Sequence, residues 1–162
     1  MADAGGTVEP QGHPALAELT TLRVGGPARD VVSARTRAEL VEAVRTADHR
    51  GVPLLPIGGG SNRLVAYAGF CGTLVRIGTR GISPEFAEPG WVRVRVEAGE
   101  PWEHVVATSV EQGWSGIEAL SGIPGSTGAT PIQNVGAYGA EVAQVIETLE
   151  VLDRSTGAVT SM

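Results

Sequence analysis

The sequence predicts an α+β fold, either one domain or two small lobes that share a core. Three observations predict it. A capped amphipathic helix is expected between two short apolar strands, a strand of strictly alternating character precedes a second helix, and two glycine-rich stretches interrupt the regular structure. A length of 162 residues is the size of one domain, since domains commonly contain about 100–150 residues.

The first elements are a strand and a helix that follow an irregular start. Residues 1–15 are rich in Gly and Pro and are expected to form a mobile tail. A strand is predicted at Asp30–Ala34. Thr36 and Glu39 then have the spacing of a capping box, which opens a helix that ends at Gly51. The apolar face of this helix is formed by Leu40, Val41, Val44 and Ala47.

Three further strands are predicted from apolar runs. Val52–Ile57 is continuously apolar between prolines and glycines, which favours a buried strand leading into the sequence GGGSN. Thr73–Ile77 is a second apolar run. Trp91–Ala98 alternates valine with charged residues, as expected of a strand with one buried face.

A helix is predicted from Pro101 to Gln112, with proline at its start and Gly113 after its end. One face of this helix is formed by Trp102, Val105, Val106, Ser109 and Val110. Regular structure in Ser121–Gly139 can only be short, because this segment contains five glycines and two prolines. Strands at Thr148–Asp153 and Ala158–Met162 are expected to form a hairpin around a turn.

The composition argues against several classes of function. A net charge of −6 opposes binding to nucleic acid or to an anionic membrane, because both depend on basic patches. The sequence contains no apolar run of about 18 residues and no signal-peptide pattern, so we expect a cytoplasmic protein. The three histidines have no partners at metal-ligand spacing, and no metal site is expected. The single cysteine, Cys71, is expected to be a small buried residue.

The glycine loop, defined as Gly58, Gly59, Gly60, Ser61 and Asn62, is the first candidate site. Three residues without side chains let backbone N–H groups approach phosphate oxygens closely. The loop matches neither a Walker loop nor the dinucleotide fingerprint GxGxxG. A plain tight turn is the alternative interpretation.

The long glycine-rich segment, Ser121–Gly139, is the second candidate site. It combines a backbone free to fold around a ligand with several hydroxyl and amide side chains. The alternative is a surface loop, although a nineteen-residue loop without a function is uncommon in a compact domain. Because few side chains can pack it, we expect this segment to be loose without a ligand.

Four motifs occur in order along the chain, namely TTLRVGGPA (Thr20–Ala28), PIGGGSN (Pro56–Asn62), Gly69-Phe70 with Gly72, and LSGIPGSTGATPIQNVGAYG (Leu120–Gly139). Together they resemble the UDP-N-acetylenolpyruvoylglucosamine reductase family, an α+β flavoenzyme family. The resemblance implies an FAD-binding domain of the p-cresol methylhydroxylase (PCMH) type over residues 16–162. Its two α+β lobes are expected at about residues 16–72 and 73–162, with FAD bound non-covalently between them.

The same resemblance assigns the cofactor site and the reaction. It matches the glycine loop to the FAD pyrophosphate, and it matches seven further positions to the rest of the flavin. These are Ile123, Pro124, Gly128, Ala129, Gln133, Gly136 and Tyr138. The implied reaction passes hydride from NADPH through FAD to the enol ether of a UDP-sugar, giving UDP-N-acetylmuramate.

No catalytic residue is assigned within the chain. The resemblance places the proton-donating serine, with its glutamate and arginine companions, beyond residue 162, and we therefore expect a truncated domain that lacks a substrate-binding part. The alternatives are the FAD domain of another PCMH-type sugar or lactone oxidoreductase, or a non-catalytic truncated product. Arg63, Tyr67 and Cys71 depart from the family pattern beside the glycine loop. Arg63 either neutralises a phosphate or faces solvent.

Overall fold

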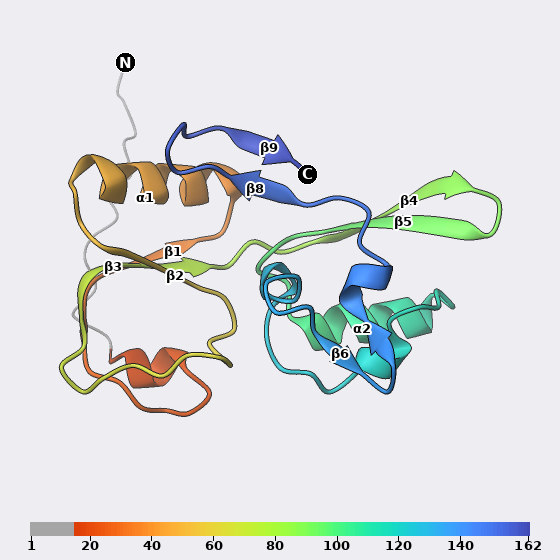
Figure 1. Cartoon of the computed structure of the whole chain (residues 1–162), viewed down its shortest axis with the longest axis horizontal. Coiled ribbons are helices and arrows are strands. Elements are labelled where there is room, and N and C mark those ends of the chain that lie inside the picture. The colour runs from red at the N-terminus through yellow and green to blue at the C-terminus, as the bar shows by residue number, and fades with distance from the viewer. Residues whose placement is uncertain (1–14) are drawn as a thin grey trace, which may run out of the picture.

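The computed structural model describes residues 15–162, which form two lobes side by side (Figure 1). The tail expected at residues 1–15 lies outside the described residues except for Ala15, which forms an isolated bridge with Pro27. Each lobe has its own cluster of buried apolar side chains. The α+β fold expected from the sequence is confirmed.

The first lobe is built on a parallel sheet of three strands in the order β1 (Ala28–Ala34), β3 (Phe70–Ile77) and β2 (Leu54–Ile57). β3 takes the centre because its middle residues can be buried on both faces, as Leu74 and Val75 are. The predicted buried strand Val52–Ile57 is wrong in two respects. β2 starts two residues later, and as an edge strand it fully buries only Ile57.

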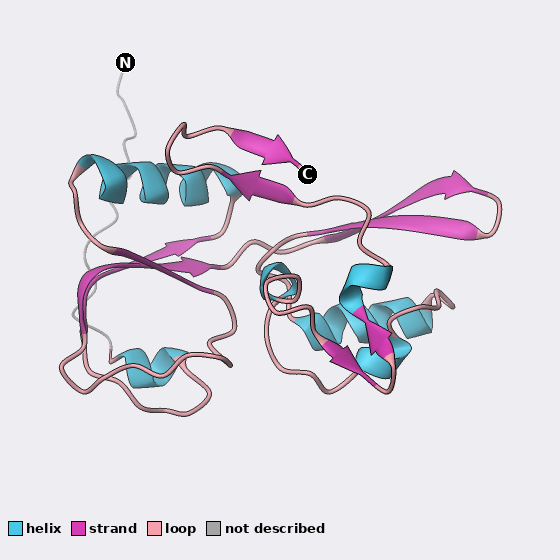
Figure 2. Ribbon diagram, viewed as in Figure 1, coloured by secondary structure: helices cyan, strands magenta, loops and turns pink. Residues whose placement is uncertain are grey.

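The two faces of this sheet are covered by α1 (Arg37–His49) and by the short helix η1 (Leu16–Leu19) (Figure 2). The N-cap of α1 is half of the predicted capping box. The Thr36 hydroxyl accepts a hydrogen bond from the Glu39 amide at 3.2 Å, but the Glu39 carboxylate accepts from the Arg35 amide instead of the Thr36 amide. The buried residues of α1, Val44 and Ala47, belong to the predicted apolar face.

An antiparallel hairpin of β4 (Ile82–Glu88) and β5 (Trp91–Val96) leads into the second lobe. The alternating burial predicted for β5 is confirmed, with its three valines half-buried and its charged residues exposed. β4 was not predicted from the sequence. It contains Pro84 and two glutamates, which are poor strand formers, and it is tolerated because this strand pairs on one side only.

The core of the second lobe is centred on α2 (Trp102–Glu111), which presents Trp102, Val105 and Val106 to it. The predicted helix is confirmed, and Gly113 follows its end with a φ of 72°. The prediction that Val110 belongs to the buried face is wrong, because this residue is 57% exposed. The buried face of α2 is therefore narrower than the sequence pattern indicates.

The rest of the second lobe consists of short elements, as expected for a glycine-rich region. They are η2 (Glu118–Leu120), η3 (Thr127–Ala129), β6 (Gly136–Ala137), β7 (Ala140–Glu141) and η4 (Val142–Gln144). Leu120, Val135 and Val142 from this region complete the core around α2. Within residues 15–162, no helix is both long enough and apolar enough to cross a membrane.

The predicted C-terminal hairpin forms from β8 (Glu150–Leu152) and β9 (Val159–Ser161), but it lies beside α1 of the first lobe (Figure 1). Arg154 pairs with Asp48, and the Arg45 guanidinium donates to the Gly157 carbonyl at 2.8 Å. The lobe boundary expected between residues 72 and 73 would fall inside β3, which pairs with β1 and β2 up to Ile77. The C-terminal hairpin also returns to the first lobe at the end of the chain.

The two faces of α2 give a direct test of this packing. Val106 is 1% exposed and Val110 is 57% exposed. We expect Val106→Ala to lower the free energy of unfolding by about 1.5–3 kcal/mol, because it removes buried apolar surface and leaves a cavity. Val110→Ala should change it by less than about 0.5 kcal/mol. Urea unfolding of both variants measures the difference, and equal losses would contradict the burial assigned to α2.

Candidate functional site

The two glycine-rich stretches singled out in the sequence meet at the interface of the lobes. The Ser61 hydroxyl donates a hydrogen bond to the Pro124 carbonyl at 3.2 Å, and the side-chain amide of Asn62 donates to the side-chain oxygen of Gln133 at 2.9 Å. These contacts join positions 63 and 71 residues apart in the sequence. The structure thus brings together two candidate sites that the sequence could only identify separately.

Glycine leaves room for the neighbouring segments at this loop. A Cβ atom on Gly59 would lie 3.1 Å from the Gly125 backbone, and one on Gly58 would lie 2.0 Å from the side-chain oxygen Ser126 Oγ. Within the first lobe, a Cβ atom on Gly60 would lie 1.9 Å from the Leu19 carbonyl oxygen. Gly60 also has a φ of 71°, which a residue with a side chain rarely adopts. The sequence analysis attributed these glycines to phosphate approach, whereas the structure shows that they also allow protein segments to pack.

The glycine loop presents a row of free hydrogen-bond donors. Within residues 15–162, the backbone N–H groups of Gly59, Gly60, Ser61 and Asn62 have no acceptor. Unpaired main-chain donors are uncommon in folded proteins unless water or a ligand accepts from them. Consecutive N–H groups in a loop are also the usual way in which proteins bind phosphate. The geometry therefore suits an anion.

The start of the long glycine-rich segment is anchored by hydrogen bonds to the start of α2. The Trp102 indole donates to the Leu120 carbonyl at 3.0 Å. The Glu103 carboxylate accepts from the Ser121 hydroxyl at 2.8 Å and from the Gly122 amide at 2.5 Å. The sequence analysis did not foresee these carboxylate and main-chain anchors. The looseness expected for this segment without a ligand stays a prediction.

Glu100 is a further anchor and is also buried. Its side chain is 6% exposed and lies 2.7 Å from His104 Nδ1, and it also accepts from the Gly81 amide at 2.8 Å. Its backbone carbonyl accepts from the amide and the hydroxyl of Thr127. His104, which the sequence left without a partner, contacts this carboxylate.

The charge state of Glu100 follows from competing effects. Burial opposes the charged form, but hydrogen bonds from His104 and the Gly81 amide, together with the charges of His104 and Arg80, outweigh it. The pKa of Glu100 is therefore lowered. The pKa of Glu103 is lowered as well, because the Gly122 amide and the Ser121 hydroxyl stabilise its charge. Both carboxylates remain ionised at neutral pH and act as structural acceptors.

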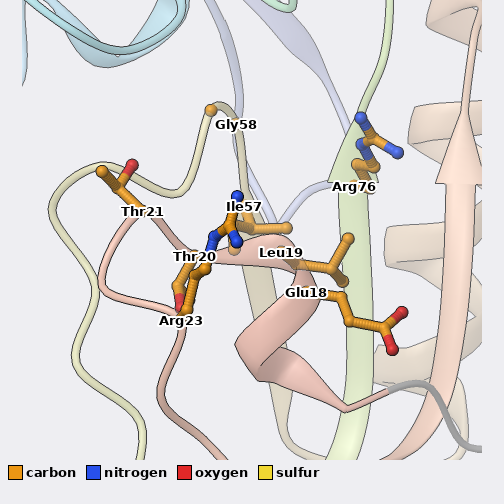
Figure 3. Close-up of a pocket in the computed structure, with 9 residues that line it drawn as sticks. Glu18, Leu19, Thr20, Thr21, Arg23, Ile57, Gly58 and Arg76 are labelled. Carbon is orange, nitrogen blue, oxygen red and sulfur yellow. The ribbon is translucent and has the colours of Figure 1, made fainter.

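A pocket of about 380 Å³ opens beside the glycine loop (Figure 3). Gly58 and Gly59 line it together with residues to which the sequence analysis assigned no site role, namely Glu18, Leu19, Thr20, Thr21, Arg23, Ile57 and Arg76. The Thr21 amide donates to the Gly60 carbonyl, which ties this wall to the loop. The signals in the sequence were the motif TTLRVGGPA and a lone arginine at the end of an apolar strand.

The other expected cofactor positions are distributed over the second lobe. Ile123 packs against the core around α2, and Gly128 lies against Ala98, where a Cβ atom would be 2.7 Å away from the alanine side chain. Ala129 ends η3. Gly136 and Tyr138 lie on β6 and in the turn after it, away from the contacts with the glycine loop described above. Tyr138 is 96% exposed.

Some residues weighed in the sequence analysis are placed differently from expectation. Cys71 is exposed and not buried, because it lies near the start of β3 beside a shallow apolar hollow formed with Ala68 and Phe70. Arg63 and Tyr67 are also exposed. Among the described residues, no group of three or more His, Cys, Asp or Glu side chains is placed to hold a metal ion.

Glu100 gives a pH-dependent test of this scaffold. Because folding lowers its pKa, its contribution to stability is complete above the ordinary carboxyl pKa of about 4.3 and is lost as the pH falls through the lowered value. We expect Glu100→Ala to cost about 1–3 kcal/mol at neutral pH, and less in acid. The exposed Glu111→Ala is the control, with little effect expected. Urea unfolding across this pH range measures both, and a constant difference between Glu100→Ala and the unsubstituted chain would contradict the assigned role.

Comparison with known proteins places these features in a family. A family described as FAD binding domain matches residues 28–162. The UDP-N-acetylenolpyruvoylglucosamine reductase of Saccharopolyspora erythraea is 52% identical over 165 residues, which cover 100% of this chain and 45% of that protein. The Cutibacterium acnes enzyme of the same name is 54% identical over 109 residues, which cover 67% of this chain and 29% of that protein.

Solved structures agree on the fold. The UDP-N-acetylenolpyruvylglucosamine reductase of Thermus caldophilus superposes with a TM-score of 0.73 at 31% identity, covering 93% of this chain and 51% of that one. A solvent-stable cholesterol oxidase shares the fold alone, with a TM-score of 0.54 at 16% identity. The chain spans less than half the length of the two curated relatives. It belongs to the FAD-binding domain family and corresponds to the FAD-binding part of the UDP-N-acetylenolpyruvoylglucosamine reductases.

Proposed function

We propose that the chain binds FAD as the flavin-binding portion of an NADPH-dependent reductase. The intact enzyme converts UDP-N-acetylglucosamine enolpyruvate to UDP-N-acetylmuramate in the cytoplasm, for peptidoglycan synthesis. The observation that carries the proposal is the row of four unpaired backbone donors in the glycine loop, held against the second lobe by Ser61 and Asn62. Relatives about half identical to this chain bear the name of that enzyme.

The residues present fit the pyrophosphate of FAD. N–H groups from Gly59 to Asn62 can donate to its oxygens, and Gly59 carries no side chain that would cover them. Each hydrogen bond to a charged group contributes about 1.5–3 kcal/mol. The distant acidic residues that make up the net charge of −6 are screened beyond about 8 Å. Local donors therefore outweigh the overall charge.

The second lobe would hold the remainder of the cofactor. Ile123, Pro124, Gly128, Ala129, Gln133, Gly136 and Tyr138 are the positions that we propose for it. Glu100, Glu103 and Trp102 position this segment without touching a ligand, through the hydrogen bonds described above. Bound FAD would supply the flavin N5 that accepts hydride from NADPH and delivers it to the enol ether.

The chemistry that remains needs residues from outside this chain. The proton that follows the hydride requires a positioned acid, and we assign that role to the part of the relatives that this chain does not match. The same part would bind the UDP-sugar. Another flavin-dependent sugar or lactone oxidoreductase is a weaker alternative, because the structural match outside the reductases is at 16% identity. We propose neither nucleic acid nor membrane as a partner.

Hydrogen exchange tests the proposed contact amide by amide. Without FAD, we expect fast exchange at the four loop amides, Gly59 to Asn62, because they have no acceptor within the described chain. Thr127 and Gly128 should already exchange slowly, since their amides donate to the carbonyls of Glu100 and Ala98. Saturation with FAD should markedly slow exchange only at the four loop amides, Gly59 to Asn62. Loop amides that exchange at the same rate with and without bound FAD would contradict the proposal.

Turnover gives a second test of the assignment. Saturated with FAD, the chain should oxidise NADPH slowly and should not pass the hydride to the enolpyruvyl substrate within seconds. A missing general acid alone removes roughly 10²–10⁴-fold in rate, and lost orientation of the UDP-sugar removes more. Anaerobic stopped flow that follows flavin absorbance measures both steps. Rapid formation of UDP-N-acetylmuramate would show that residues 1–162 contain a complete active site.

A further inference from the structure

Two arginines line the pocket beside the glycine loop, and they come from separate elements. Arg23 lies in the turn after η1, and Arg76 lies near the end of β3, where it is in register with Ile57 of β2 (Figure 3). Gly58 and Gly59 form the adjoining wall of the same pocket. The pocket therefore combines two guanidinium groups with the start of the proposed phosphate loop.

Neither guanidinium is used to stabilise the fold. Arg93 and Arg154 form bidentate pairs with Glu147 and Asp48, whereas Arg23 and Arg76 have no ion pair or side-chain hydrogen bond within residues 15–162. Guanidinium groups suit bidentate contacts with phosphate oxygens. Both side chains are free to make such contacts with a ligand in the pocket.

The backbone at Arg23 supports a role for its side chain. Its φ of 52° lies in the left-handed region, which glycine or asparagine adopts more readily than arginine. The turn is fixed by a hydrogen bond from the Arg23 amide to the Thr20 carbonyl at 3.1 Å, and the Thr20 hydroxyl donates to the Val24 carbonyl. The fold thus holds an arginine at a position that a smaller residue would occupy with less strain.

The charges that line the pocket favour an anion. Arg23, Arg76 and Glu18 are the charged residues of the lining, which leaves one net positive charge. The hydroxyl groups of Thr20 and Thr21 are the other polar side chains of the lining. The net charge of the pocket lining is therefore opposite in sign to the net charge of the whole chain, which is −6.

We propose that Arg23 and Arg76 bind the pyrophosphate of FAD together with the amides of the glycine loop. They act as cofactor-binding residues that raise the preference for FAD over flavins without phosphate. Glu18 weakens the attraction of the two arginines for the pyrophosphate. The proposal rests on the proposed function, because it assigns these side chains to the same cofactor.

The test compares dissociation constants for FAD and for riboflavin, measured by flavin fluorescence at low and raised salt. The variants are Arg23→Gln, Arg76→Gln and Glu18→Gln, with the exposed Arg50→Gln after α1 as a control that removes the same charge. We expect each pocket arginine variant to weaken FAD about tenfold or more, with riboflavin unchanged and a shallower dependence on salt. Glu18→Gln should tighten FAD, and Arg50→Gln should behave like the unsubstituted chain.

The outcomes separate the two proposals. If the unsubstituted chain binds FAD and neither pocket arginine variant alters that affinity, this assignment is overturned while the proposed function stands. Equal losses for FAD and riboflavin would assign a structural role to the arginines and also overturn it. Absence of FAD binding by the unsubstituted chain would refute the proposed function itself. Because Arg76 is exposed on its strand, Arg76→Gln keeps the test valid if Arg23→Gln does not fold.

Discussion

The contact between the glycine loop and the segment from Pro124 to Gln133 is the constraint on which the rest of the structure depends. The two segments lie so close there that a Cβ atom on Gly59 would lie 3.1 Å from the Gly125 backbone, and one on Gly58 would lie 2.0 Å from the side-chain oxygen Ser126 Oγ. To bring them together, β2 must end at the interface of the lobes, and α2 must fix the opposite segment. The site therefore depends on both lobes, although each lobe has its own apolar core.

Two acidic side chains hold backbone segments of the second lobe in place through hydrogen bonds. The Glu103 carboxylate accepts from the Gly122 amide of the glycine-rich segment, and the Glu100 carboxylate accepts from the Gly81 amide before β4. Both carboxylates are therefore used within the fold, whereas the proposed anion site consists of unpaired N–H groups and two guanidinium groups. This division explains how a chain with a net charge of −6 can present a site for a phosphate group.

The sequence predicted those features that depend on local spacing. Both long helices and the final hairpin were found, and the alternation of valine with charge in Trp91–Val96 was confirmed. The errors concern properties that only packing decides. Val110 has the spacing of the buried face but lies at its exposed edge, and Cys71 lies near the exposed start of a strand. The return of β8 and β9 to α1 depends on Arg154 and Asp48, which are 106 residues apart.

The candidate site was predicted in parts. GGGSN and Ser121–Gly139 were each identified by their glycines, but their contact through Ser61 and Asn62 could not be deduced from spacing. Arg23 and Arg76 were missed because the motif TTLRVGGPA gave no role to its arginine and a lone arginine at the end of an apolar strand does not by itself indicate a ligand. The most direct test of the account is a crystal structure of this chain with FAD. It should place pyrophosphate oxygens about 2.7–3.2 Å from the backbone nitrogens of Gly59 to Asn62, whereas a pyrophosphate bound elsewhere, with those amides in water, would contradict the account.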